Sequence, residues 1–598
     1  MKKKIIIKRI ILFLLLIINI FAFSSCKKDN SIKFNFASYG TAEKVPYNVF
    51  YEDDYFKNPA SNYNPKLASA SACLALAGFA DISEDDFSNQ DINAKTFFKN
   101  LGFSNYKANI YGITKPTANS FGVYIASKKI DDFTLIGITV RGAGYLSEWA
   151  SNFTIGHNED FAQGFFEASD IYLNFLKEYI NDYNIKGNIK IWTSGYSRGG
   201  AVVNISAGRI DDGLVKYKNI LSDEINYTKD DIYAYAFEAP AGKIIKNNDE
   251  EIFEKGSYYS NIFNIINLND PVPFVAPRSF LFIRYGNDLF LPDIITDLNY
   301  LNHINIVKNK MKKLPNYKVV GDYKIDNFKE ESSLSFMNKE SNYINFTPYI
   351  SLNNLFYMLC QIIESKDYYV DNVQDIITEL FRLLYSSSTP KESLINLIIN
   401  FGKSLLQNDI NEVILFDIQY NPKQFTHDLE PLLYQALSKL DINITLSDTK
   451  TLIKQLSKLI YYIIFAEDGF QTIKSILNLE NIKIIGSAHI PELLLCHITS
   501  LDSNYENSNL EVKSSFEILN IFTSSEFELT INNEKYVYFE NGNINSKFVL
   551  KKKIDGNYLI YLPSNTNFKI TSSGSLSYDQ YYHNNKFVHD ILIDSKTL

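Results

Sequence analysis

Ser197 is the residue of this 598-residue chain whose surroundings most suggest chemistry, because the segment GYSRG has the form G-x-S-x-G. A serine hydroxyl becomes a strong nucleophile when a nearby base takes its proton, and hydrolases place such a serine on a sharp strand-to-helix turn. The run NIKIWTSG before Ser197 predicts a strand, and AVVNISAGRI after it predicts a helix. The alternative is a glycine-rich turn with a helix-capping serine. The strand–turn–helix context favours the nucleophile.

Two carboxylates compete for the role of the acid that orients a catalytic histidine. In α/β-hydrolase triads the acid follows the serine along the chain and the histidine comes last. Asp270 ends the predicted strand NIFNIINLN, where its carboxylate would accept the Nδ1–H of the histidine and stabilise the imidazolium. The alternative is a turn aspartate before Pro271. Glu238, in FEAP at the end of the preceding predicted strand, is the second candidate acid, and we expect it to have a structural role.

The chain has seven histidines, and one of them must act as the catalytic base. Two candidates, His489 and His497, lie after both the serine and the acid, in the segment IKIIGSAHIPELLLCHI. The run NIKIIGSA predicts the final strand of a sheet, and Pro491 suits the first turn of a following helix. His489 then lies at the carboxyl end of that strand, whereas His497 lies about 12 Å further along the helix. We therefore predict that His489 is the general base. The alternatives are a helix-capping His489 and a His497 that packs against the sheet.

The elements around these residues predict an α/β fold. From residue 133 to 270, short apolar runs such as FTLIGITV and DIYAYAF alternate with helical segments such as FAQGFFEASDIYLNFLKEYI. This alternation is typical of a parallel sheet with helices on both faces, and catalytic groups on such sheets gather at the carboxyl ends of the strands.

The loop VRGAGYLSEW after the strand FTLIGITV is the expected source of an oxyanion-binding group. Backbone N–H groups from such a loop and from the residue after the nucleophile can hold the negative oxygen of an acyl-transfer intermediate. The donors here would be the N–H groups of Ala143 and Arg198. The alternative is a plain glycine turn in which Arg141 and Trp149 pack.

The order of three motifs in this chain resembles the motif order of the class-three, or fungal-type, lipases. These motifs are VRGAGYLSEW, GYSRGGA and NLNDPVP. The chain is most similar to a bacterial lipoprotein branch of lipase-like proteins, which shares the block from YEDDYF to LALAGF, IRYG and HIPE. The resemblance covers roughly residues 46–290 and 480–500 and implies an α/β-hydrolase fold with the serine, aspartate and histidine named above as its triad. The family often carries Thr or Ser at position 143, so Ala143 would contribute only its backbone N–H.

Composition and charge narrow the classes of partner. The net charge is −9, and it becomes −14 without the five basic residues of the N-terminal leader, so nucleic acid is a poor electrostatic match. Cys73, Cys360 and Cys496 are widely spaced in apolar runs, which indicates buried thiols rather than a disulfide framework or a metal site. We expect no metal and no cofactor.

The N-terminus predicts a lipid anchor. Basic residues precede the apolar run 10–23, which is too short to span a membrane but suits a signal peptide. The ending FSSC resembles a relaxed bacterial lipobox with Phe23 where leucine is commoner, so Cys26 is the expected lipidation site. The alternative is ordinary signal cleavage that releases a secreted protein.

Changes in the pattern of apolar residues along the chain predict several structural parts. The middle of the chain has helical periodicity, and this segment would either form a cap over the site or only pack against the core. Short alternating apolar runs with Asn-Gly and Asp-Gly turns follow it. The expected parts are a lipoprotein signal peptide (1–25), a tether (26–45), an α/β-hydrolase core (46–300 and 481–507), a helical insertion (301–480) and a C-terminal β-sandwich domain (508–598).

Together these patterns predict a membrane-anchored serine hydrolase of the bacterial cell envelope. Its substrates would be acylglycerols, phospholipids or smaller carboxyl esters. The alternative from another class is a non-catalytic surface lipoprotein that uses the same fold for binding.

Overall fold

The computed structural model describes the following residues: 31–37, 44–80, 90–109, 121–142, 160–217, 219–244, 258–268, 270, 272–274, 282–292, 300–314, 489–505, 508–514, 517–523, 525–531, 534–540, 543–546, 557–562, 567–582 and 587–592. The predicted lipidation site Cys26 and the predicted oxyanion residue Ala143 lie outside these residues. Residues 315–488 are also outside the described residues, and they include most of the predicted helical insertion and the predicted final strand.

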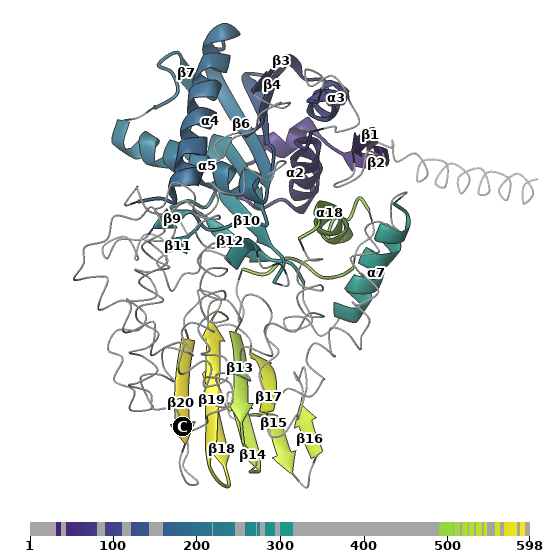
Figure 1. Cartoon of the computed structure of the whole chain (residues 1–598), viewed down its shortest axis with the longest axis vertical. Coiled ribbons are helices and arrows are strands. Elements are labelled where there is room, and N and C mark those ends of the chain that lie inside the picture. Colours follow the sequence, from purple (N-terminus) through teal and green to yellow (C-terminus); the bar gives the residue numbers. More distant parts are fainter. Residues whose placement is uncertain are drawn as a thin grey trace, which may run out of the picture.

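A mixed sheet forms the centre of the α/β part (Figure 1). Its strands run in the order β12-β10-β8-β6-β5-β4-β3, and β7 (Ile225–Asn226) pairs with β6 at one end. All neighbours from β5 to β12 are parallel, so the sheet is mostly parallel. The strand bounds are β3 Ser104–Asn109, β4 Val123–Ile130, β5 Phe133–Val140, β6 Gly187–Tyr196, β8 Ile232–Phe237, β10 Ile262–Ile266 and β12 Asn287–Phe290.

The strands within residues 133–270 are parallel, as the sequence predicts, and the edge formed by earlier residues is antiparallel. β4 pairs antiparallel with both β3 and β5. Only Asp131 and Asp132 separate β4 from β5, and Asp131 has a φ of 45°. A two-residue connection can only form a hairpin, because a parallel pair needs a crossover of a dozen or more residues.

Helices cover both faces of the sheet, as the sequence predicts. α4 (Gln163–Asp182) and α5 (Arg198–Tyr217) pack on one face in a core that includes Ile191 of β6. Trp192, the next residue along β6, points to the opposite core. That core holds α2 (Pro65–Ala77), α3 (Ile92–Asn100), α7 (Tyr300–Lys312) and α18 (Pro491–Ser500). The two-residue alternation of β6 therefore separates two hydrophobic cores.

The N-terminal hairpin begins within the segment predicted to be a tether. β1 (Ser31–Ala37) pairs antiparallel with β2 (Lys44–Phe50). Phe34 of β1 is buried and meets Phe97 of α3 edge to face, with the ring centroids 5.2 Å apart. Ile32, Phe34 and Phe36 alternate with polar residues, and this strand pattern explains why the segment pairs.

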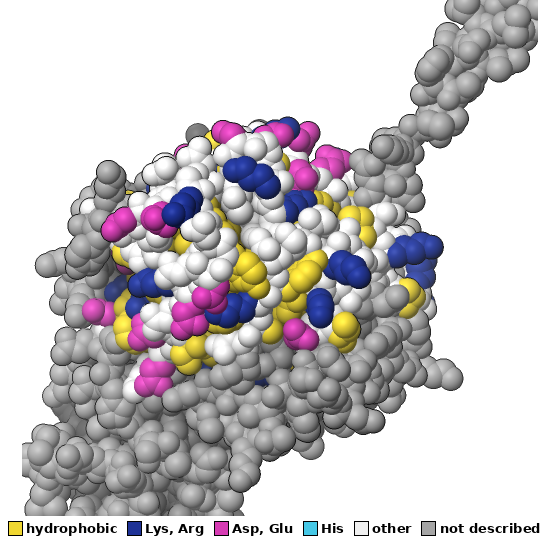
Figure 2. Space-filling view, turned by 90° about the horizontal axis from the view of Figure 1, so that it is seen from above, with side chains coloured by type: hydrophobic (Ala, Val, Ile, Leu, Met, Phe, Trp, Pro, Cys, Tyr) yellow, Lys and Arg dark blue, Asp and Glu magenta, His cyan; other side chains and the backbone are white. Residues whose placement is uncertain are grey.

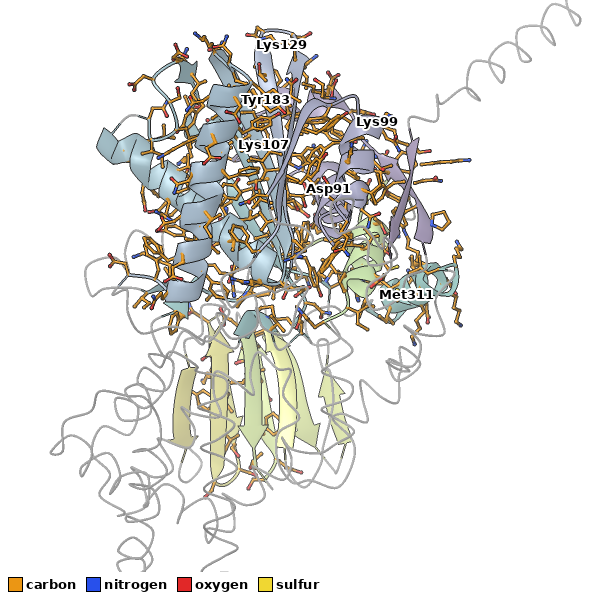
Figure 3. The ribbon with its side chains drawn as sticks, turned by 45° about the horizontal axis from the view of Figure 1, so that its top comes forward. Asp91, Lys99, Lys107, Lys129, Tyr183 and Met311 are labelled. Atoms are coloured by element: carbon orange, nitrogen blue, oxygen red, sulfur yellow. The ribbon has the colours of Figure 1, made fainter. Side chains whose placement is uncertain are left out.

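The exposed edge of the sheet carries charge. In Figure 3, Lys107 of β3 lies beside Tyr183, at the end of α4. The Lys107 ammonium is 2.7 Å from the Asp182 carboxylate, and the Tyr183 hydroxyl donates to the backbone oxygen of Tyr106 at 2.9 Å. A lysine on an edge strand opposes pairing with another chain, and these contacts also bind β3 to α4.

The C-terminal residues form two four-stranded antiparallel sheets. Apolar side chains of both sheets share one core, which includes Leu519, Leu529 and Ile570. One sheet runs β17 (Asn557–Leu562), β13 (Glu517–Phe522), β19 (Leu576–Tyr582), β20 (Phe587–Leu592); the other runs β16 (Asn543–Ser546), β15 (Glu534–Glu540), β14 (Phe527–Ile531), β18 (Phe568–Ser572).

On the face shown in Figure 2, acidic and basic side chains are interspersed with apolar ones. Among the described residues, no helix combines the length and the apolar character that crossing a membrane requires. The short elements are the 3-10 helices η1 (Asp53–Lys57), η4 (Lys229–Asp231) and η5 (Val272–Phe274), and the antiparallel pair β9 (Lys243–Ile244) and β11 (Phe282–Ile283).

Candidate active site

Ser197 occupies a sharp turn between β6 and α5. Its φ is 56°, a left-handed conformation that is uncommon for a residue with a side chain. The Ser197 N–H donates to the backbone oxygen of Phe237 at 2.8 Å, and its own oxygen accepts the Ala201 N–H at 3.0 Å. The first bond ties the turn to the neighbouring strand β8, and the second begins α5. This strained turn is the placement that a nucleophilic serine needs.

Glycines at the turn allow the backbone segments to approach one another. A Cβ on Gly199 would lie 2.4 Å from the backbone oxygen of Val140, at the end of β5. A Cβ on Gly195 would lie 2.4 Å from the Gly199 carbonyl, and one on Gly200 would lie 2.9 Å from the Phe237 oxygen. Real Cβ atoms do not come this close to backbone. The three glycines are therefore required by close packing of strand and helix.

The side chains of Ser197, His489 and Asp270 form one hydrogen-bonded chain. His489 Nε2 lies 2.9 Å from Ser197 Oγ, and His489 Nδ1 lies 2.5 Å from Asp270 Oδ2. The Asp270 side chain is completely buried, while the His489 side chain is 16% exposed. Asp270 follows β10, and His489 lies just before α18. Three residues predicted from separate motifs are thus brought together at the carboxyl ends of the strands.

Backbone groups fix the direction in which Asp270 points. The Val272 N–H donates to Asp270 Oδ1 at 2.9 Å, so Oδ2 remains for the histidine. The Asp270 N–H donates to the backbone oxygen of Asn267 at 3.0 Å, which closes the turn. With Nδ1–H donated to Asp270, His489 Nε2 is the acceptor of the Ser197 hydroxyl. In this tautomer the histidine can take the serine proton.

Tyr196 packs directly on His489, a contact that sequence reasoning missed. The two ring centroids are 5.0 Å apart, with 29° between the ring planes. Tyr196 is buried and precedes Ser197, so the strand that carries the nucleophile also supports the base. The only signal in the sequence was the position of Tyr196 next to the serine, which does not reveal a distant partner.

His497 lies away from the hydrogen-bonded chain. It is buried on α18, and its Nδ1 lies 3.0 Å from Nε2 of His303, a residue of α7. Burial, and then the neighbouring His303, hold the pKa of His497 well below its usual range. His497 on α18 thus contacts α7 through His303.

Arg198, one of the two predicted oxyanion residues, is the first residue of α5, so its backbone N–H lies at the N-terminal end of that helix, next to Ser197. Gly142 leads towards Ala143, and a Cβ on Gly142 would lie 3.1 Å from the backbone oxygen of Tyr196. The loop after β5 therefore starts beside the turn.

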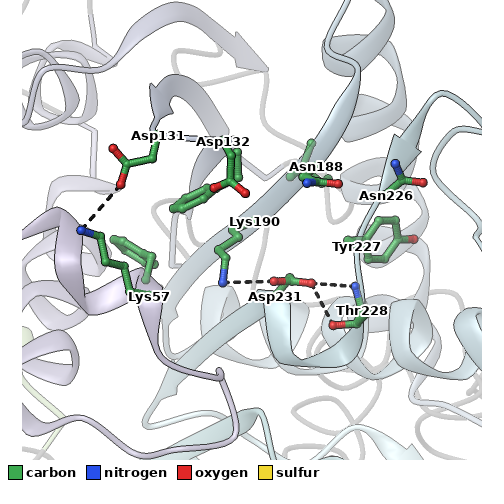
Figure 4. Close-up of a pocket in the computed structure, with 12 residues that line it drawn as sticks. Lys57, Asp131, Asp132, Asn188, Lys190, Asn226, Tyr227, Thr228 and Asp231 are labelled. Atoms are coloured by element: carbon green, nitrogen blue, oxygen red, sulfur yellow. Dashed lines mark hydrogen bonds and ion pairs between the residues drawn. The ribbon is translucent and has the colours of Figure 1, made fainter.

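A cavity of about 480 Å³ lies at the opposite end of the sheet (Figure 4). It is lined by the start of β6, including Lys190, which is seven residues or roughly 23 Å of extended strand before Ser197. Its charged groups pair with one another: Lys190 with Asp231 at 3.1 Å and Lys57 with Asp131 at 3.6 Å. This cavity is therefore remote from the hydrogen-bonded chain of Ser197, His489 and Asp270.

The side chains hydrogen-bonded in a chain with Ser197 supply an imidazole and a carboxylate. Within the described part of the chain, no group of three or more His, Cys, Asp and Glu side chains could hold a metal ion. A buried carboxylate, a partly exposed imidazole and a hydroxyl in line are the groups used for acyl transfer.

The chain is similar to fungal lipases over part of its length. It matches the native propeptide complex of the Rhizomucor miehei lipase with 16% identity and a TM-score of 0.23, over 32% of this chain and 58% of that one. Lipase II from Rhizopus niveus matches with 12% identity and a TM-score of 0.24, over 40% and 79% of the two chains. Mono- and diacylglycerol lipase from Aspergillus oryzae matches with 15% identity and a TM-score of 0.25, over 40% and 84%.

No family model matches the chain, and no curated protein matches its sequence. A likeness at TM-scores below 0.5 does not establish a shared activity. The chemistry of the site therefore rests on its own hydrogen bonds, burial and backbone conformation.

The glycine packing at the turn gives a first prediction. Gly199→Ala should lower the free energy of unfolding by about 1–3 kcal/mol, because the added Cβ meets the rigid backbone of Val140. Gly213→Ala on the same helix is the comparison: its Cβ would meet the Ile220 side chain rather than backbone, so the loss of stability should be smaller than for Gly199→Ala. Urea unfolding measures both. Equal stability of the two variants would contradict the predicted packing.

Proposed function

We propose that this protein is a serine carboxyl-ester hydrolase that acts through an acyl-enzyme. The observation that carries the proposal is the chain Ser197–His489–Asp270, with the serine on a strained turn and the aspartate buried. This is the constellation of nucleophile, general base and orienting acid.

The proposed reaction assigns one role to each of these groups. Ser197 Oγ attacks the ester carbonyl while His489 Nε2 takes its proton, and the backbone N–H groups of Ala143 and Arg198 stabilise the oxyanion. His489 then gives the proton to the leaving alkoxide. A water molecule attacks the acyl-enzyme with His489 again as base, and the acid is released. Asp270 stays ionised throughout and stabilises the imidazolium.

The substrates we propose are acylglycerols, phospholipids or smaller carboxyl esters. We further propose an α/β-hydrolase core that is interrupted by a helical insertion over residues 301–480 and followed by a β-sandwich domain. An insertion placed before the catalytic histidine would lie over the site and shield an acyl chain from water. We also propose that Cys26 is lipidated and holds the protein at a membrane of a bacterial cell envelope, on the support of the leader sequence.

Replacement of Ser197 tests the nucleophile. Ser197→Ala should lower kcat for p-nitrophenyl esters by about 10³-fold or more and abolish labelling by a fluorophosphonate probe. Ser194→Ala is the matched control, because Ser194 lies on the same strand but its hydroxyl donates to the backbone oxygen of Ser71 at 2.7 Å. Undiminished labelling of Ser197→Ala would refute the assignment. A wild-type protein that neither hydrolyses esters nor reacts with the probe would favour a binding function.

The choice between the two histidines is tested in the same assay. His489→Ala should lose nearly all activity because no other group takes the serine proton. His497→Gln should keep most of its activity, since His497 contacts His303 rather than the site, although its stability should fall. Circular dichroism shows whether each variant is folded. A folded, active His489→Ala beside a folded, inactive His497→Gln would overturn the assignment.

The lipid anchor has its own test. The protein made in its native host should partition into detergent phase and incorporate labelled fatty acid, and Cys26→Ser should remove the label. A mature protein that begins after residue 25 with a free N-terminus and no modification would show that the chain is simply secreted.

A further inference from the structure

Tyr196 is a buried aromatic residue that the mechanism above does not use. It is the last residue of β6, and its ring lies on the ring of His489 with the centroids 5.0 Å apart and 29° between the planes. The two ring nitrogens of His489 contact Ser197 and Asp270. Stacking uses one face of the imidazole and leaves its nitrogens to the groups that exchange and stabilise the proton.

The alternation of β6 explains why Tyr196 points towards His489. Every second residue of this strand, including Trp192, Ser194 and Tyr196, faces the core that holds α2 and α18. Trp192 Nε1 donates to Ser71 Oγ at 2.8 Å, and Ser194 Oγ donates to the backbone oxygen of the same residue of α2 at 2.7 Å. His489 lies just before α18, on the same side of the sheet. The pleat of the strand therefore directs the tyrosine ring to the imidazole.

Neighbouring groups hold the Tyr196 ring in this position. Its backbone pairs with Phe237 of β8, and its ring contacts the ring of Phe79, with the centroids 6.1 Å apart and 57° between the planes. Phe79 itself packs at the start of the loop after β5, because a Cβ on Gly142 would lie 3.0 Å from Phe79 Cζ. The tyrosine ring is thus fixed before any reaction begins, so no reorganisation is needed when charge develops on the histidine.

The charge on His489 changes during the proposed reaction. The imidazole is neutral when it accepts the Ser197 proton, and it becomes an imidazolium in doing so. The face of an aromatic ring is negative and attracts a cation that lies within about 6 Å of the ring centroid. The centroid distance of 5.0 Å between Tyr196 and His489 is within this range. The attraction is absent from the neutral pair, so it favours the transition state over the ground state.

We propose that Tyr196 is a positioning residue whose ring stabilises the imidazolium that His489 forms when it takes the Ser197 proton. The proposal rests on the proposed hydrolase function. Two groups then stabilise the same positive charge: Asp270 acts through Nδ1, in the plane of the imidazole, and Tyr196 acts on its face. The effect belongs to the aromatic ring, so phenylalanine at this position retains it and an electron-poor ring does not.

Fluorinated phenylalanines at position 196 separate this role from simple packing, because fluorine withdraws charge from the ring face with little change of shape. Tyr196→Phe keeps the ring and is the reference. Incorporation of difluoro- and trifluorophenylalanine in its place should lower kcat/KM in steps, by about 3- to 30-fold in total. Activity is expressed per active site titrated with fluorophosphonate, which removes effects of misfolded protein.

Phe98 provides the matched control. It is buried in the same core and stacks on Tyr124, with the ring centroids 5.9 Å apart. The same fluorinated rings at position 98 should leave kcat/KM unchanged, because no charge develops beside them. Equal losses at positions 98 and 196 would contradict the proposal, and so would equal activity of all three rings at position 196.

The pH profile shows whether the ring acts on a charge. The acid limb of kcat/KM reports protonation of the free enzyme's base. An electron-poor ring stabilises the imidazolium less, so this limb should move to lower pH with each added fluorine at position 196. A fall in kcat/KM with an unmoved acid limb would show packing alone and overturn the proposal. The buried charged groups on the surrounding elements are the same in every variant: Asp270 after β10, Glu238 after β8, Arg141 after β5, Arg198 of α5 and Glu492 of α18.

Nuclear magnetic resonance of histidine-labelled protein follows the same titration without any turnover. The His489 signal is assigned by its loss in His489→Ala, and it should titrate at lower pH with trifluorophenylalanine at position 196 than in Tyr196→Phe. If the wild type neither hydrolyses esters nor reacts with the probe, the proposed function fails while this measurement still decides the role of the ring. A titration that does not move overturns the proposal, and a shift to lower pH supports it.

Discussion

The close approach of the first turn of α5 to the ends of β5 and β8 is the constraint on which the site depends. Gly199 lies against the Val140 carbonyl, and the Ser197 N–H bonds to Phe237. These contacts leave Ser197 in a left-handed conformation with its hydroxyl directed at His489. The backbone strain there, of order 1–3 kcal/mol, is balanced by the surrounding sheet and helix packing.

The parallel pairing of β6, β8 and β10 brings the ends of these strands close together. Ser197, Glu238 and Asp270 follow the adjacent strands β6, β8 and β10, so roughly 5 Å separates one strand end from the next. Two of these residues, Ser197 and Glu238, have positive φ. The turns after β6 and β10 thus direct Ser197 and Asp270 towards His489, which lies just before α18.

Glu238 and Asp270 are two buried carboxyl groups with different hydrogen-bond partners. Both are almost fully buried, and a pair of adjacent charges in that environment is unfavourable. Different donors surround them: Asp270 accepts from Val272 and lies against the imidazole, while Glu238 accepts from Asn267. The same chemical group therefore contacts the histidine in one place and holds a backbone turn in the other.

Local patterns in the sequence determined the elements of the α/β part. The apolar runs of β5, β6, β8 and β10, the helical periods of α2, α4 and α5, and the glycines around Ser197 are properties of neighbouring residues. The mostly parallel sheet with helices on both faces follows from their alternation. The antiparallel edge and the strand in the predicted tether were missed, because a two-residue hairpin and a short alternating run were given less weight than the general pattern.

Tertiary structure decided which side chains meet. Sequence order and the predicted end of a strand selected Ser197, Asp270 and His489, but their hydrogen bonds join residues 219 and 292 positions apart. The stacking of Tyr196 on His489 and the bonds from the Asn267 N–H to Glu238 left no periodic signal, since each depends on strand order and turn geometry. The sequence by itself determined the kinds of reactive group and the turns that carry them. Only the folded chain decided their partners, because pairing and protonation depend on distance and burial rather than on neighbours in sequence.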